Sequence, residues 1–182
     1  CGFKVNSGEY KLMGLAPYGE PKYKKLILKN LIDIKDDGSF KLNMKYFKYH
    51  RGLRMISSKF IKLFGNKARN PDDKITQFYM DIASSIQEVT EEVILKIASN
   101  LRVKTNQKNL CLSGGVALNC VANGMLLEKS GFEKIWVQPA SGDAGNALGA
   151  ALAFCYTSQN KNRDVASSDA MKSAYLGPEF TN

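Results

Sequence analysis

The sequence has 182 residues, of which 44% are hydrophobic and 24% are charged, with a mean hydropathy of −0.27. These values are typical of one globular domain, at about 100–200 residues per domain, and they exclude wholesale disorder, a collagen-like repeat and a disulfide-rich miniprotein. The 26 Lys and Arg residues outnumber the 17 Asp and Glu residues, so the net charge is +9, which bears on partners rather than on fold.

The first predicted elements are short. A helix over 10–15 is expected inside the Gly- and Pro-rich segment 7–21, ending before Pro17. Residues 23–33 are helical or mixed in pattern. Apolar and polar residues then alternate on both sides of Asp36-Asp37-Gly38, which predicts a β-hairpin with the glycine at its turn.

The positive charge is concentrated in the first half of the chain, between residues 22 and 70, and the aromatic part of this stretch, 44–70, has no predicted order. A lysine-rich segment can bind phosphate-rich partners. A solvated surface, or one that faces an acidic neighbour, explains it more simply, because charge alone says little about a site.

A long helix is the clearest prediction. Pro71-Asp72-Asp73 is a helix-start signal, with acids at the positive end of the dipole. Apolar residues then recur every three or four positions to about Arg102, which predicts one buried face of a core helix. These residues are Ile75, Phe78, Ile82, Ile86, Val89, Val93, Ile97 and Leu101.

Strands and helices alternate in the second half, which favours an α/β fold with parallel strands. The predicted order is a strand over 109–112, a helix over 116–129 ended by Gly131, a strand over 135–138 and a helix over 143–156. Residues 157–182 are predicted to be a linker.

Two glycines follow the first of these strands, in the segment LCLSGGVALNCVANG. Gly114 and Gly115 let a ligand approach the backbone, and the helix that follows presents unpaired N–H groups. This arrangement suits a nucleotide phosphate or sugar. The spacing matches neither common phosphate-binding motif, so a tight strand–helix turn is the simpler interpretation from spacing alone.

A second small-residue turn follows the next strand, in WVQPASGDAGNALGAALA. Asp143 can cap the following helix, which spacing alone favours, or it can ligate a cation. Gly142 and Gly145 keep the turn free of bulky side chains.

The reactive side chains are few. His50 is the only histidine, which argues against a catalytic triad or a histidine-rich metal site within this chain. Cys111 and Cys120 are predicted to be small buried hydrophobes, and the absence of CxxC pairs points to a reducing, cytoplasmic compartment. No membrane-spanning or targeting segment is visible.

Four motifs in order, GEYKLMGLAPYGEP, LSGGVALNCVANG, IWVQPASGDAGNALGAALA and YLGPEF, resemble the O-carbamoyltransferases related to nodulation proteins and antibiotic-tailoring enzymes. The resemblance implies an actin/Hsp70/sugar-kinase-like (Kae1-like) domain with nucleotide between two α/β lobes. Residues 1–156 would be part of the second lobe, and 157–182 would lead to a C-terminal YrdC-like domain. The chain is therefore expected to be a fragment that is inactive alone.

The resemblance also implies the site residues. Gly114, Gly115 and Asn119 would lie beside ATP, with Gly142 and Gly145. Asp143 resembles a ligand of a divalent metal, Fe(II), Mn or Zn, whose partner ligands lie outside this chain. In the signature GEYKLMGLAPYG, Glu9 and Lys11 are the polar candidates for the cleft.

The implied reaction joins ATP and carbamoyl phosphate into carbamoyl-adenylate, and then transfers the carbamoyl group to a hydroxyl of a sugar or natural product. Two alternatives remain open: a Kae1-type transferase that modifies tRNA, and a non-enzymatic basic binding module. Regular aromatic pairs for stacking on bases are missing, which argues against nucleic acid. The remaining domains of the polypeptide are expected partners, and exposed sheet edges predict some self-association.

Overall fold

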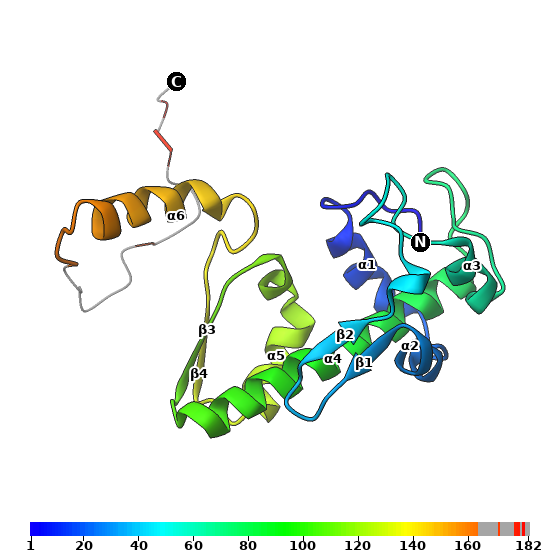
Figure 1. Cartoon of the computed structure of the whole chain (residues 1–182), viewed down its shortest axis with the longest axis horizontal. Helices are drawn as coiled ribbons and strands as arrows, with labels where there is room; N and C mark the ends of the chain where they lie inside the picture. Colours follow the sequence, from blue (N-terminus) through cyan, green and yellow to red (C-terminus); the bar gives the residue numbers. More distant parts are fainter. Residues whose placement is uncertain (164–170, 172–176, 179, 181–182) are drawn as a thin grey trace.

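The computed structural model describes residues 1–163, 171, 177–178 and 180 (Figure 1). The predicted linker 157–182 therefore lies mostly outside the described residues. The elements are α1 (Glu9–Leu15), η1 (Ala16–Tyr18), α2 (Lys24–Asn30), β1 (Ile32–Ile34), β2 (Phe40–Leu42), η2 (Met44–Tyr46), α3 (Ser58–Phe64), α4 (Gln77–Thr105), β3 (Asn109–Leu112), η3 (Gly115–Leu118), α5 (Cys120–Lys129), β4 (Lys134–Val137), α6 (Gly145–Ala153) and η4 (Phe154–Ser158).

Helix α4 crosses the molecule and connects its two ends (Figure 1). Elements α1 and α2 lie along its first part, the turn of the β1–β2 hairpin contacts Ile97 further along it, and β3, α5 and β4 lie at its other end. The predicted long helix is confirmed, but its predicted start at Pro71-Asp72-Asp73 is wrong. It begins at Gln77 because Asn70 donates to the Asp73 carboxylate through its backbone N–H at 3.1 Å and holds this stretch in a turn.

The buried face of α4 differs from the predicted one at its end. Ile97 and Leu101 are 44% and 41% exposed, and Ala98 is buried instead. Ala98 packs with Leu110, Leu126 and other residues of the β3–α5–β4 end in one core cluster. A small side chain lets the helix approach its neighbours closely. The buried face of α4 therefore includes Ala98 at this end and leaves out Ile97 and Leu101.

The β1–β2 hairpin is confirmed as an antiparallel pair, with Ile34 opposite Phe40. Gly38 takes a φ of +83° at its turn. A Cβ there would lie 2.4 Å from the backbone nitrogen of Ile97, so the turn needs glycine both for its conformation and for its contact with α4.

The α/β alternation of the second half is also confirmed. Strands β3 and β4 pair in parallel, with Leu110 beside Ile135, and α5 connects them. The predicted helix over 116–129 is wrong in its first turn. A 3-10 turn, η3, comes first, and α5 begins at Cys120 because the Asn119 side chain accepts from Ala122 N and caps it.

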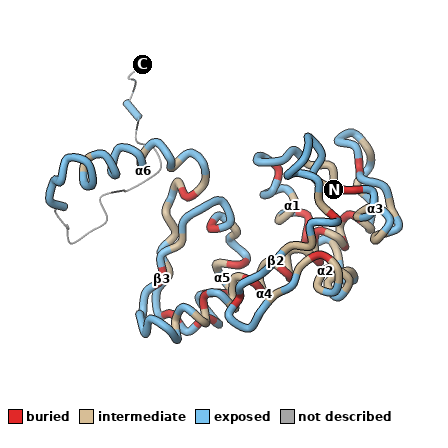
Figure 2. Tube along the Cα trace, viewed as in Figure 1, coloured by how far each residue is buried: buried red, intermediate tan, exposed pale blue. Residues whose placement is uncertain are grey.

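The prediction that Cys111 and Cys120 are buried is wrong, because both are exposed. Leu110 points toward the core of the β3–α5–β4 end, and the next residue of a strand, Cys111, points to the opposite face. In the described part of the molecule, that face of the two-stranded sheet has no covering layer (Figure 2).

Helix α6 is shorter than the predicted 143–156. It spans Gly145–Ala153 and continues as a π-helical turn, η4. None of its residues is buried (Figure 2). Its small side chains therefore remain available for close packing.

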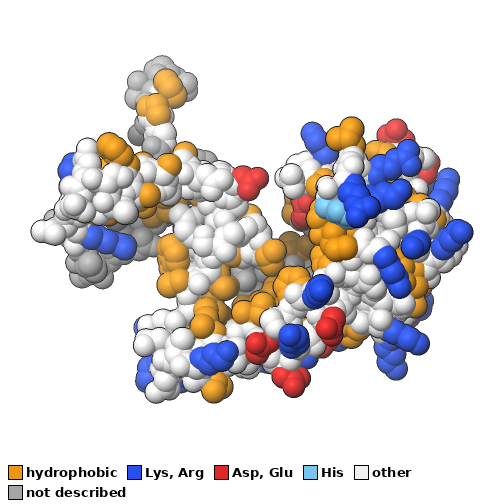
Figure 3. All heavy atoms as spheres, in the orientation of Figure 1, with side chains coloured by type: hydrophobic (Ala, Val, Ile, Leu, Met, Phe, Trp, Pro, Cys, Tyr) orange, Lys and Arg blue, Asp and Glu red, His pale blue; other side chains and the backbone are white. Residues whose placement is uncertain are grey.

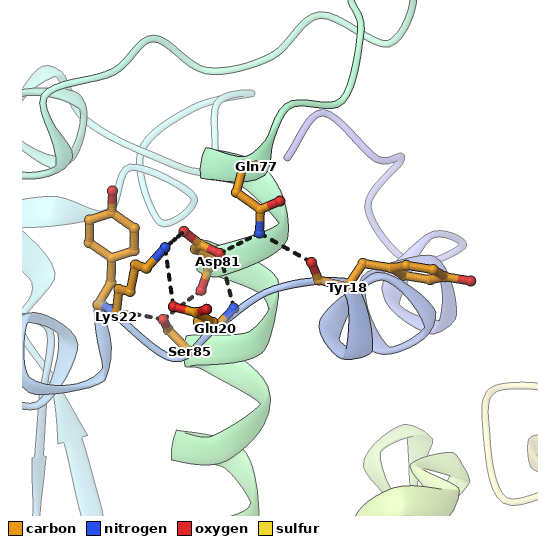
Figure 4. A network of polar contacts seen from close by, with 7 residues as sticks. Tyr18, Glu20, Lys22, Gln77, Asp81 and Ser85 are labelled. Atoms are coloured by element: carbon orange, nitrogen blue, oxygen red, sulfur yellow. Dashed lines mark hydrogen bonds and ion pairs between the residues drawn. The ribbon is translucent and has the colours of Figure 1, made fainter.

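The segment after α1 is fixed onto α4 by a polar network (Figure 4). The Asp81 carboxylate accepts from Glu20 N at 3.0 Å, from Gln77 Nε2 at 2.8 Å and from Lys22 Nζ at 3.0 Å. Ser85 Oγ accepts from Tyr23 N at 3.0 Å. The Ala16–Tyr23 segment thus gains its position from polar groups on one face of α4.

Gly19 makes the closest backbone approach in this segment, because a Cβ there would lie 2.1 Å from the carbonyl oxygen of Met80. We expect Gly19→Ala to lower the free energy of unfolding by about 1–3 kcal/mol, since the segment would have to move off α4. Gly14→Ala is the control: nothing lies within 4 Å of its added Cβ, and alanine should stabilise α1 by about 0.5–1 kcal/mol. Urea denaturation of both variants tests the pair, and equal effects would contradict it.

Candidate functional site

Two glycine-containing turns meet where the parallel strands β3 and β4 end. The first follows β3 at Ser113-Gly114-Gly115, and the second follows β4 at Ser141-Gly142-Asp143. The backbone N–H of Gly114 donates to the carbonyl oxygen of Ser141 at 2.8 Å. The structure therefore joins two of the predicted motifs into one site, which we call the paired turns.

Glycine is required at Gly114 in the first turn and at Gly145, the first residue of α6 just after the second turn. Gly114 has a φ of +101° and a ψ of 163°, a conformation that residues with a Cβ rarely adopt. A Cβ on Gly145 would lie 2.1 Å from the carbonyl oxygen of Ala140. No atom of the described residues lies within 4 Å of an added Cβ at Gly114 or Gly115, so this part of the structure leaves the first turn open on its outer side.

Asn119 lies beside the first turn, but its side chain is already engaged. Its Oδ1 accepts from Ala122 N at 3.1 Å and from Gln87 Nε2 at 3.1 Å, while its Nδ2 donates to Gln87 Oε1 at 3.0 Å. This amide pair holds the start of α5 against α4. Asn119 thus positions the first turn, and a direct contact with a ligand would require it to give up one of these bonds.

Asp143 is exposed in the second turn. The N-cap of α6 is Ala144, and it has no side-chain capping hydrogen bond, so the capping role that spacing favoured for Asp143 is wrong. The Asn146 N–H instead bonds the backbone carbonyl of Asp143 at 3.1 Å. The carboxylate is therefore left available for a ligand.

A complete metal site does not form within residues 1–163 or the other described positions, where no three His, Cys, Asp or Glu side chains gather. The single carboxylate of Asp143 is one oxygen ligand, and divalent cations require several. Among the described residues, Asp143 is thus the one ligand that we assign to such a site.

Sequence reasoning missed Ser141. The residue is 5% exposed, and its Oγ finds no hydrogen-bond partner among the side chains and backbone groups that the structure describes. A buried polar group without a partner costs about 1–3 kcal/mol, so a hydroxyl in this state indicates a contact supplied by a ligand or by water. The only signal in the sequence was its position between the strand end and Gly142.

Glu9 and Lys11 lie on α1 and are both exposed. Glu9 accepts backbone N–H bonds from Asn6 at 2.8 Å and Gly8 at 3.1 Å, and the bond from Asn6 is the main reason that the pKa of its carboxyl lies below the ordinary value. The Lys11 ammonium lies 5.8 Å from the centre of the Tyr10 ring. Glu9 therefore stabilises the start of α1, and its contact with the paired turns stays a prediction.

The two ends of the molecule face each other across a hollow, whose walls and floor carry hydrophobic side chains (Figure 3). None of the helices that the structure describes is long and apolar enough to cross a bilayer.

Comparison with known proteins gives the same family as the motifs. The family model described as the carbamoyltransferase N-terminus matches residues 1–152. An uncharacterized protein of Synechocystis sp. is 59% identical over 181 residues, which cover 100% of this chain and 29% of that protein. The nodulation protein NolO of Bradyrhizobium diazoefficiens is 34% identical over 174 residues, 96% of this chain and 29% of NolO.

A third relative is the nodulation protein NolNO of Sinorhizobium fredii, 33% identical over 172 residues, which cover 94% of this chain and 23% of NolNO. The chain thus spans less than a third of the length of each of these relatives.

Proposed function

The chain belongs to the carbamoyltransferase family, and we propose that it forms part of a Kae1-like domain in an O-carbamoyltransferase. In the proposed reaction, water first converts carbamoyl phosphate into carbamate and inorganic phosphate, and a carbamate oxygen then attacks the α-phosphorus of ATP to give carbamoyl-adenylate with release of pyrophosphate. A hydroxyl oxygen of the acceptor, a sugar or a natural product, then attacks the carbamoyl carbon, and AMP leaves. The adenylate would form in a YrdC-like domain elsewhere in the polypeptide.

The observation that carries this proposal is the pair of turns joined by the Gly114–Ser141 hydrogen bond. In open α/β sheets, ligands bind outside the carboxyl ends of parallel strands, which is where these turns lie. Since the first turn is open beside Gly114 and Gly115, it suits the close approach of a nucleotide.

Each residue of the site then has a role. Gly114 and Gly115 line the adenylate, and Gly142 and Gly145 shape the second turn behind it. The buried Ser141 hydroxyl supplies a hydrogen bond to the bound group. Together the turns would orient the carbamoyl carbon toward the acceptor, which lowers the entropy cost of the transfer.

A divalent metal fits the proposed site only in part. The Asp143 carboxylate would be one ligand of Fe(II), Mn or Zn, and the others would come from the rest of the polypeptide. When bound, such a cation neutralises phosphate charge beside the transferred group. Asp143 itself contributes a negative charge and a position for the cation.

The test is an assay of the full-length protein with ATP, carbamoyl phosphate, a divalent metal and a panel of sugar acceptors. Pyrophosphate release reports the adenylate, and mass spectrometry reports the adenylate and the carbamoylated acceptor. A protein that forms no adenylate with any metal would contradict the proposal. Salt-sensitive binding of tRNA would then favour the tRNA-modifying alternative.

The geometry of the first turn gives a sharper prediction. We expect Gly114→Ala to weaken the binding of adenylate or ATP about tenfold, because a Cβ at a φ of +101° strains the turn by about 1–3 kcal/mol. Gly124→Ala in α5 is the matched control, since it adds the same methyl group into open space. Calorimetric titration of the full-length protein measures both affinities. Equal affinities would exclude Gly114 from the nucleotide contact.

A further inference from the structure

A cavity of about 740 Å³ lies at the end of the molecule remote from α6, between η2, the loop over residues 47–57 and the start of α3. Its volume is within the range of about 300–1,000 Å³ that small-molecule sites occupy. It belongs to the basic segment 44–70, for which the sequence predicted no order.

The backbone of the loop is held at its base. Phe47 and Ile56 form an antiparallel bridge, and Lys48 N donates to Met55 O at 2.9 Å. The buried Ser57 donates through its Oγ to Lys45 O at 3.0 Å. The residues between these contacts therefore form a loop whose two ends are held together.

The charged lining of the cavity has one sign. Five of its side chains are cations: Lys45, whose ammonium lies 4.8 Å from the centre of the Tyr46 ring, and four others, Lys48, Arg51, Arg54 and Lys59. No Asp or Glu among the described residues lines it. None of the four forms a salt bridge with a carboxylate of the described chain, and none donates a side-chain hydrogen bond there. By contrast, Lys24 on α2 has two carboxylate partners, Glu88 and Glu92.

The cavity also has an apolar part. Phe47 lines it and packs on Phe60 and Tyr49, with ring centroids 6.0 Å apart in both pairs. Leu53 lines it as well, and its side chain is fully exposed among the cations. Folding gains nothing from an apolar side chain in that position, whereas a bound ligand would cover it.

We propose that this cavity binds an organic phosphate, with the phosphate on the Arg51, Arg54 and lysine side chains and the organic group on Phe47 and Leu53. Arginine recognises a phosphate through two parallel hydrogen bonds, and unpaired cations close together favour a dianion over a single carboxylate. The proposal concerns a second ligand of the protein and does not rest on the transfer reaction. It gives the basic segment a role that the paired turns leave unexplained.

The test uses phenyl phosphate as the probe, titrated into the full-length protein by calorimetry. We expect it to bind at least tenfold more tightly than inorganic phosphate, which lacks the apolar group, and than benzoate, which lacks the phosphate. Lys48→Gln/Lys59→Gln is expected to weaken phenyl phosphate about tenfold. Lys25→Gln/Lys129→Gln removes the same charge from α2 and α5, outside the cavity, and should leave the affinity within twofold.

Three outcomes would overturn the proposal. One is no binding of phenyl phosphate, and another is equal weakening by the two variants, which would indicate general attraction by the net charge. The third is that a single-stranded oligonucleotide binds, with an affinity that rises with its length, while phenyl phosphate does not. This result would make the segment a nucleic-acid surface. Thermal denaturation followed by circular dichroism confirms that each variant is folded, and an exposed lysine without a partner should not change it.

Discussion

Asp143→Ala in the full-length protein is expected to lower carbamoyl transfer about a hundredfold or more while pyrophosphate release continues. The reason is that the proposed metal sits with the transfer step and would lose one of its few ligands, and losses around metal sites cost at least about 10–100-fold. The adenylate should therefore accumulate in the variant, and mass spectrometry would measure it beside the carbamoylated acceptor.

The fold should not change in this variant. Asp143 is exposed and its side chain caps no helix, so its removal should leave the free energy of unfolding within about 0.5 kcal/mol of the parent value. Glu128→Ala removes an exposed carboxylate from α5 and is the control, with transfer expected at the parent rate. If transfer persists in Asp143→Ala with unchanged metal dependence, Asp143 is not a ligand of the catalytic metal.

The sequence predicted the elements that rest on local rules. The hairpin at Gly38, the strands β3 and β4 and the existence of α4 all follow from periodicity and turn chemistry within a few residues. The predicted start of α4 was wrong because Arg69, two residues before Pro71, donates to the carbonyl oxygens of Pro71 and Asp73 and to that of Cys1, and so keeps this stretch in a turn. The bond to Cys1, across 68 residues of sequence, depends on tertiary placement, which periodicity does not record.

The sequence predicted individual residues of the candidate site but not how they come together. Gly114 and Asp143 stand out in the sequence because small residues follow a strand in both motifs. The hydrogen bond that joins the two turns could not be predicted, since it depends on the parallel register of β3 and β4. The engagement of Asn119 with Gln87, across 32 residues of sequence, is a contact of the same kind.

The Asp81 network was not predicted from the sequence. Asp81 stands beside Ile82 of the predicted apolar face of α4, and hydrophobic periodicity gives no reason for a charged side chain to be buried there. Asp81 is 4% exposed because the Ala16–Tyr23 segment crosses this face of α4 and brings donors to it (Figure 4). The polar residues of α4 thus mark the face that the Ala16–Tyr23 segment covers, which hydrophobic periodicity alone does not show.

Asp81→Ala is expected to lower the free energy of unfolding by about 2–4 kcal/mol. The substitution leaves the backbone N–H of Glu20 without its acceptor, and it removes the carboxylate that holds Lys22 and Gln77. Asp72→Ala is the control, because that carboxylate is exposed and its loss should cost no more than about 0.5 kcal/mol. Urea denaturation of the chain at pH 7 measures both, and equal effects would show that the network contributes little.

The same network predicts how stability depends on pH. The bond from the Glu20 N–H, followed by those from Gln77 and Lys22, holds the pKa of the Asp81 carboxyl below its ordinary value of 3.8. A carboxyl whose pKa is lowered by folding contributes stability above its unfolded pKa, and the contribution is lost as the pH falls through its folded pKa. The difference between the parent and Asp81→Ala should therefore be constant from pH 7 to about pH 5 and shrink below the ordinary pKa. Denaturation curves taken at intervals down to pH 3 would reveal this, and a difference that stayed constant to the lowest pH would show that Asp81 acts through packing rather than through its charge.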